Sequence, residues 1–165
     1  GGADNRFFIY DLQTSSLNRE LKLNSRITQI IPSPINPNIA LITTAGRSEQ
    51  FIVFDQRLQG YDGITLKFGQ QEGDNLSRYV RPDIHQNGYV VCCGSQSNAK
   101  LNFWDLRSRN VIRGGPSFSL DTGMSARILR SVFLPYKNTV VSTSSYRELA
   151  WLDYNVKKDE MIQTL

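Results

Sequence analysis

Few side chains of this sequence could carry out chemistry. It contains one histidine, His85, and two cysteines, Cys92 and Cys93, which are adjacent in the chain. A zinc site takes several such ligands at suitable spacing, and a nucleophilic thiol needs a base beside it. Because His85 has no second ligand at such a spacing, we expect it to be structural or solvated, and we expect the cysteines to be small buried hydrophobic residues. The glycine pairs at 1–2 and 114–115 lack the Gly-Lys-Ser/Thr ending of a phosphate-binding loop, so we predict no catalytic residue, no metal and no cofactor.

The composition indicates a chain that can form a packed core. Of its 165 residues, 39% are hydrophobic and 21% are charged. No apolar run approaches the roughly 18 residues of a membrane-spanning helix, so we expect no membrane partner. Two cysteines without a disulfide framework fit an intracellular compartment, the nucleus or the cytoplasm. The formal net charge of +4 permits an acidic or nucleic-acid partner without requiring one.

The elements that would position any site are short strands. Apolar runs rich in Val, Ile, Thr, Phe and Tyr are bounded by Gly, Pro, Asn and Ser, which is typical of strands and turns. Helical periodicity is weak, so the predicted fold class is all-β. Asn87 and Gly88 favour a tight hairpin between the segments on either side. We predict strands at residues 6–10, 27–31, 39–44, 51–54, 64–68, 89–93, 101–104, 128–133, 139–142 and 149–152.

Four stretches of the sequence align on one aspartate. A run of aromatic and aliphatic residues precedes each aspartate, and successive aspartates are 44, 50 and 48 residues apart. These residues are Asp11, Asp55, Asp105 and Asp153. A strand of small residues comes before each of the last three runs, at 41–45, 91–95 and 140–144. Self-similarity at such a period predicts one supersecondary unit per repeat.

These repeats resemble those of the WD40 family, whose blades are about 40–45 residues long with four strands each. The third unit ends in Trp104 and Asp105, the WD dipeptide itself, and two other units end in an aromatic residue followed by aspartate. The resemblance implies a WD40-like β-propeller segment of about three and a half four-stranded blades over residues 1–165. The sequence lacks the Gly-His dipeptide of the family. The usual Asp–His–Ser–Trp hydrogen-bond tetrad therefore cannot form, and the blades must depend more on packing.

The number of blades implies an incomplete ring, because closed propellers have about four to eight blades. We therefore expect another chain, further sequence or an identical copy to complete the propeller. Residues 161–165 are expected to form a last outer strand, and Trp104 is expected to pack on an adjacent blade.

Two arginines follow repeat aspartates at the same offset. Arg57 comes two residues after Asp55, and Arg107 comes two residues after Asp105. This arrangement is similar to the paired Asp-x-Arg motifs of WD40 substrate receptors that dock the damaged-DNA-binding adaptor of cullin–RING ubiquitin ligases. The alternative is that each arginine pairs with a residue of its own blade. We favour this alternative for at least one of the two arginines, and we expect its guanidinium to be buried.

We predict a non-catalytic protein-interaction scaffold within a multiprotein complex. A ubiquitin-ligase substrate receptor and a chromatin- or nucleic-acid-binding propeller are the alternatives. The turns before each third strand and the loops at 70–78 and 121–127 are expected to share one face, because propellers bind through their loops. A basic cluster that extends from Arg107 to Arg130 is expected to be a solvated rim rather than a nucleic-acid groove. The predicted partner-binding residues are Arg47, Glu49, Gln96, Asn98, Tyr146 and Arg147, with Arg57 and Arg107 on the opposite face.

Overall fold

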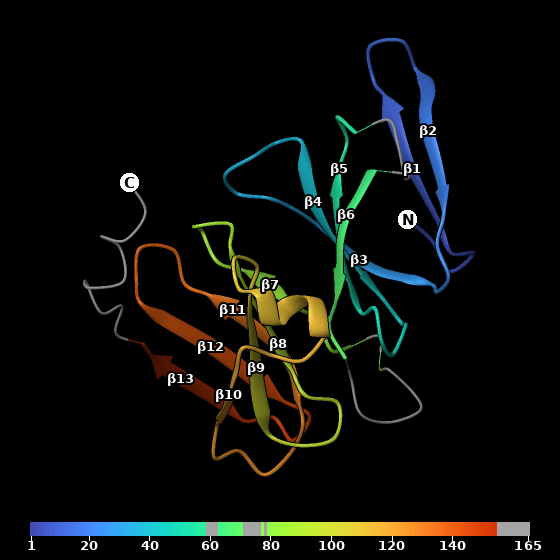
Figure 1. Ribbon diagram of the computed structural model, residues 1–165. Helices are drawn as coiled ribbons and strands as arrows, with labels where there is room; N and C mark the ends of the chain where they lie inside the picture. The colour runs from blue at the N-terminus through green and yellow to red at the C-terminus, as the bar shows by residue number, and fades with distance from the viewer. Residues whose placement is uncertain (59–62, 71–76, 78, 155–165) are drawn as a thin grey trace.

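The computed structural model describes residues 1–58, 63–70, 77 and 79–154 as an arc of antiparallel sheets (Figure 1). Within these residues there are thirteen strands and one 3-10 helix, η2. They are β1 (Arg6–Asp11), β2 (Ser16–Lys22), β3 (Ile27–Pro32), β4 (Ile39–Thr44), β5 (Phe51–Asp55), β6 (Ile64–Phe68), β7 (Asp83–Ile84), β8 (Val90–Gly94), β9 (Lys100–Asp105), η2 (Arg109–Arg113), β10 (Phe118–Asp121), β11 (Ile128–Phe133), β12 (Thr139–Ser144) and β13 (Leu149–Asp153). The fold class is all-β, as the sequence predicts.

The strands form four sheets in chain order. Sheet 1 holds β1 and β2, sheet 2 runs β3-β4-β5-β6, sheet 3 runs β7-β8-β9-β10, and sheet 4 holds β11-β12-β13. Each strand pairs with the next one in its sheet by an antiparallel hairpin. The predicted strands of small residues are β4, β8 and β12, which are flanked by a strand on each side. The aspartates of the repeats end β1, β5, β9 and β13.

Neighbouring sheets pack face to face and bury three apolar seams. The seam between sheets 1 and 2 contains Phe7 and Phe54, whose rings lie 5.0 Å apart edge to face. The side chains of β8 pack in two seams, because successive side chains of a strand point to opposite faces of the sheet. Cys93 lies in the seam between sheets 2 and 3, and Cys92 lies in the seam between sheets 3 and 4. Both thiols are fully buried, which confirms the expectation from the sequence.

Trp104 is the largest fully buried side chain. It extends from β9 across the seam to sheet 2, where its ring lies 5.1 Å from Phe51 and 6.2 Å from Phe68. Its Nε1 donates a hydrogen bond of 3.3 Å to the carbonyl of Gly114. The prediction that Trp104 packs on an adjacent blade is confirmed.

The repeat aspartates stabilise the turn that follows the third strand of a blade. The Oδ1 atom accepts the backbone N–H two residues later, at 2.8 Å in Asp11 and at 3.0 Å in both Asp55 and Asp105. This short side-chain bond stabilises a turn locally, which explains why aspartate recurs at that position. Asp153 differs, since it accepts a 2.6 Å hydrogen bond from the Thr139 hydroxyl.

Sequence patterns missed the polar outer elements. The strands β2 and β10, the two-residue strand β7 and the helix η2 were not predicted, and every residue of β10 is exposed. Such strands lack a continuous apolar run because only one of their faces meets the protein. The predicted hairpin at Asn87 and Gly88 does join β7 to β8, and Gly88 has a φ of 75°. The predicted strand at 161–165 lies outside the described residues.

Candidate partner-binding faces

The turns of the sheets lie on two opposite faces. We call turn face the end formed by residues 45–50, 95–99 and 145–148, together with residues 23–26, 69–70, 77, 79–82 and 122–127 of the connections between sheets. Neighbouring sheets point the same way, so their turns lie at the same end. Gln50, in the β4–β5 turn of sheet 2, has its Nε2 atom 3.9 Å from Cys93 Sγ, near the end of β8 in sheet 3. Across the next seam, a parallel bridge joins Arg81 to Arg130. We call arginine face the other end, which holds the β5–β6 and β9–β10 connections.

On the turn face, each connection packs against the turn of its own sheet. In sheet 4 the carboxylate of Glu148 accepts hydrogen bonds from the hydroxyl of Ser125 at 2.6 Å and from that of Ser144 at 2.7 Å. These two bonds, Ser125 first, hold the pKa of Glu148 below its ordinary value. In sheet 3 the Oε1 atom of Gln96 accepts the N–H of Ser77 at 2.9 Å. The turn face is therefore fixed from within by polar side chains.

The predicted partner-binding residues of the turn face differ in accessibility. Arg47, Asn98 and Arg147 are exposed, and Tyr146 is 72% exposed. Gln96 is buried, so the prediction that it is a surface contact is wrong, and the side chain supports the loop above it. Sequence reasoning failed here because a polar residue in a turn gives no signal of burial.

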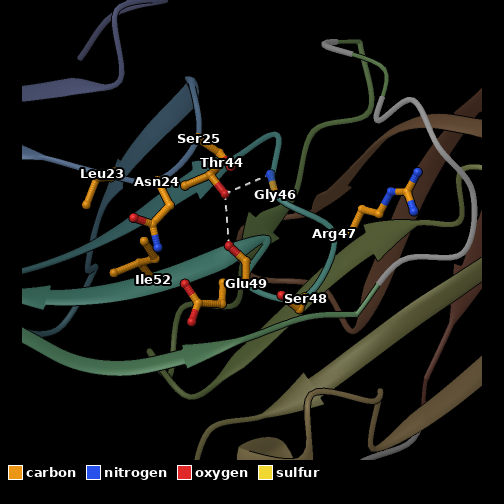
Figure 2. Close-up of a pocket in the computed structure, with 9 residues that line it drawn as sticks. All are labelled: Leu23, Asn24, Ser25, Thr44, Gly46, Arg47, Ser48, Glu49 and Ile52. Atoms are coloured by element: carbon orange, nitrogen blue, oxygen red, sulfur yellow. Dashed lines mark hydrogen bonds between the residues drawn. The ribbon is translucent and has the colours of Figure 1, made fainter.

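Glu49 takes part in an ion pair, since its carboxylate lies 2.9 Å from Lys67 Nζ. The same residue lines a pocket of about 240 Å³ over sheet 2, shown in Figure 2. The Thr44 hydroxyl stabilises the β4–β5 turn beside the pocket. It donates a hydrogen bond to the Glu49 carbonyl at 2.8 Å and accepts one from the Gly46 N–H at 3.1 Å. Arg47 extends away from these groups (Figure 2). The pocket lining is Leu23, Asn24, Ser25, Thr44, Gly46, Arg47, Ser48, Glu49 and Ile52.

On the arginine face, two identical ion pairs occupy matching corners of sheets 2 and 3. Arg57 donates from Nε to Asp55 Oδ1 at 3.0 Å and from Nη2 to Oδ2 at 2.7 Å. Arg107 donates in the same way to Asp105, at 2.9 and 2.7 Å. The hydrogen bonds from Arg57 hold the pKa of the Asp55 carboxyl below its ordinary value, and those from Arg107 do the same for Asp105.

The pairing within each blade agrees with the outcome we favoured, but the expected burial of a guanidinium is wrong. The side chains of Arg57 and Arg107 are 58% and 61% exposed. The aspartate side chains lie beneath them, and the exposed fraction is 9% for Asp55 and 31% for Asp105. Because a planar guanidinium can bond a carboxylate along one edge, both arginine side chains form these pairs and are still more than half exposed.

The basic cluster that is continuous in the sequence is divided in space. Arg107, Arg109 and Arg113 lie in or next to the β9–β10 connection, on the arginine face. Arg127 lies on the turn face, where its carbonyl accepts the N–H of Ser145, and Arg130 lies on β11. These arginines therefore do not form one basic groove.

His85 has a structural setting in the seam between sheets 3 and 4. Its Nε2 lies 2.8 Å from the Tyr154 hydroxyl, and Nδ1 accepts the N–H of Asn87 at 3.1 Å. Its ring lies 5.0 Å from that of Phe133, edge to face. Among the described residues, no group of three His, Cys, Asp or Glu side chains could hold a metal ion. No helix of the described part is long and apolar enough to cross a membrane.

Comparison with known proteins shows the fold. No protein-family model matches the chain, and no curated protein matches it. A chain of the mitotic checkpoint complex aligns with a TM-score of 0.67 at 15% identity, over 92% of this chain and 42% of that one. A chain of a ctPRC2 structure aligns with a TM-score of 0.69 at 16% identity, over 96% of this chain and 34% of that one.

A shorter protein aligns as well. The computationally designed protein Ika4 gives a TM-score of 0.61 at 18% identity, over 93% of this chain and 83% of that one. The fold is a segment of a WD40-like β-propeller. The segment spans less than half the length of the checkpoint-complex and ctPRC2 chains that it matches.

Proposed function

We propose that this propeller segment is a non-catalytic protein-interaction scaffold within a multiprotein complex. The observation that carries the proposal is the turn face, where successive blades expose Arg47, Asn98 and Tyr146 above turns fixed by internal hydrogen bonds. Binding residues placed on a rigid frame lose little conformational entropy when a partner docks. The chains that align with it belong to a mitotic checkpoint complex and to ctPRC2, which supports a role in assemblies.

The partners we propose are other protein subunits, including whatever completes the propeller, in the nucleus or the cytoplasm. Affinity purification followed by quantitative mass spectrometry tests the proposal. Replacing Arg47 and Arg147 with Glu and Tyr146 with Ala should remove specific partners, because the changes reverse charge and delete an exposed ring where a partner would dock. The substitution Lys137→Glu, at an exposed side chain in the β11–β12 turn at the opposite end of the sheets, is the matched control. An unchanged set of partners would contradict docking on the turn face.

A second candidate function is docking of a ubiquitin-ligase adaptor through Arg57 and Arg107. The observation that favours it is the equal geometry of the two ion pairs on neighbouring blades, with each guanidinium more than half exposed. Replacing both arginines with Glu should abolish co-purification of the adaptor and leave the melting temperature close to that of the Lys137→Glu control. Retention of the adaptor by the double variant would exclude this candidate.

A further inference from the structure

A larger apolar groove lies on the arginine face, where the seam between sheets 2 and 3 reaches the surface. Its volume is about 480 Å³, twice that of the pocket on the turn face. Its walls come from strand β6, the helix η2 and two hairpin connections, and they include Ile35, Leu66, Tyr89 and Ile112. Ile35 is 51% exposed, Tyr89 is 42% exposed and Ile112 is 75% exposed. Large apolar side chains that gather in one exposed depression mark an interaction site.

The groove is held in shape by the seam beneath it. Val111 in its floor is buried and belongs to the same core cluster as Trp104. The helix η2, which carries Ile112, ends at Gly114, whose carbonyl accepts hydrogen bonds from the N–H groups of Gly69 and Gln70 at 3.1 and 2.9 Å. These bonds tie η2 to the end of β6 across the seam. A preformed groove binds a ligand without the cost of ordering its own walls.

The positive charge at the rim of the groove that no described acidic side chain neutralises is that of Arg109. Two arginines, Arg107 and Arg109, line the groove, and the described lining contains no acidic residue. Arg107 is paired with Asp105 and its guanidinium lies over the Tyr89 ring, 5.3 Å from the centroid. Arg109 is exposed and has no hydrogen-bond or ion-pair partner among the residues that the structure describes. A complementary ligand therefore carries apolar groups for the walls and carboxylates for the rim.

We propose that this groove binds a short peptide segment of a partner protein, in which apolar side chains stand next to two or more acidic residues. A peptide fits the shape because several apolar walls lie along an open surface groove, and anchors of this kind dominate protein interfaces. The volume lies within the roughly 300–1,000 Å³ of sites that hold ligands. The proposal rests on the role as an interaction scaffold, but it uses a face that is separate from the turn face.

A random dodecapeptide library displayed on phage and selected on the chain immobilised within the complex that completes its propeller tests this proposal. Enriched peptides should combine two apolar residues with adjacent Asp or Glu. In fluorescence anisotropy, the variants Ile112→Asp and Arg109→Glu should bind these peptides at least about tenfold more weakly, since each puts a carboxylate at the wall or rim. A peptide with its acidic residues changed to Lys should recover binding to Arg109→Glu, which a merely structural effect would not do.

The turn-face variant Tyr146→Ala is the matched control and should bind like the unchanged chain. Both groove substitutions are at exposed side chains, and equal melting temperatures would show that the fold is intact. Absence of enrichment, enrichment of peptides without acidic residues, or binding by both groove variants as tight as that by the unchanged chain would overturn the proposal. Because the control variant leaves the groove untouched, loss of the turn-face partners and loss of peptide binding are separate results.

Discussion

At the scale of the residue, the two tryptophans test where the core lies. Trp104 is fully buried between sheets 2 and 3, whereas Trp151 is 62% exposed on β13. Trp104→Ala should lower the free energy of unfolding by about 3–5 kcal/mol, because it removes a large side chain and leaves a cavity. Trp151→Ala should change it by no more than about 0.5 kcal/mol. Urea denaturation followed by circular dichroism measures both, and similar losses would contradict the placement of the seam.

The buried cysteines give a second prediction at this scale. Burial raises the pKa of Cys93 to about 12 and raises that of Cys92 well above its ordinary value. The thiolate is the reactive form, and a thiol pKa raised by about three pH units leaves about a thousandfold less thiolate near pH 8. We expect iodoacetamide to label neither cysteine in the native chain and both in guanidinium chloride. Mass spectrometry of the two samples measures this, and rapid native labelling would show that the seams open.

The sequence identified single residues well where burial follows from residue type. Trp104 and the cysteines were placed correctly because apolar side chains in a strand have few other locations. The accessibility of polar residues could not be predicted in the same way. Gln96 is buried, and its side chain accepts a hydrogen bond from the N–H of Ser77, 19 positions earlier in the chain. Arg57 stays exposed although its partner, the Asp55 carboxylate, is nearly buried. The first outcome depends on a contact between distant segments, and the second depends on which edge of the guanidinium meets its carboxylate.

At the scale of the element, the β7–β8 hairpin depends on one glycine. Gly88 has a positive φ of 75°, and a Cβ atom at this position would overlap the side chain of Ile35 on the neighbouring sheet. We expect Gly88→Ala to destabilise the chain by about 1 kcal/mol or more, because both backbone strain and the overlap oppose alanine. The control is Gly115→Ala, where an added Cβ meets nothing within 4 Å.

Thermal melts of the single variants and of Gly88→Ala with Ile35→Ala would separate the two causes. If the overlap matters, removing the Ile35 side chain should recover part of the loss, because substitutions at residues in contact are not additive. Equal effects of Gly88→Ala and Gly115→Ala would contradict the hairpin geometry.

Elements were predictable where a strand is buried on at least one face. The strands β4, β5 and β8 have continuous apolar runs because they lie inside their sheets and between two seams. The strand β2 has a mostly polar sequence, and η2 consists of a short Asn-Val-Ile stretch between two arginines. The proposed peptide groove was invisible in the sequence for the same reason. Its walls come from segments that are far apart in the chain, and only the seam between sheets 2 and 3 brings them together.

At the scale of the whole molecule, one packing rule is repeated along the arc. Each interior sheet covers a seam on both faces, so its strands carry apolar residues at consecutive positions. In β4, Leu41 belongs to the seam between sheets 2 and 3, and Ile42 belongs to the seam between sheets 1 and 2. The sheets at the two ends of the arc have one covered face each. Their other faces determine how the chain behaves in solution.

The uncovered face of sheet 4 carries Leu149 and Trp151, which are 59% and 62% exposed and alternate with Leu152 of the seam. The uncovered face of sheet 1 carries Tyr10, which is 59% exposed. Covering such surface stabilises a protein by about 25 cal/mol per Å² of apolar area. We therefore predict that the 165-residue chain by itself is not a stable monomer. It should bind a hydrophobic dye and self-associate in light scattering. The double substitution of Leu149 and Trp151 with Glu should reduce both signals, because it replaces apolar surface with charge. A monomer that shows a sharp cooperative melt and no dye binding would contradict this, since it would mean that a one-sided sheet is stable at each end of the arc.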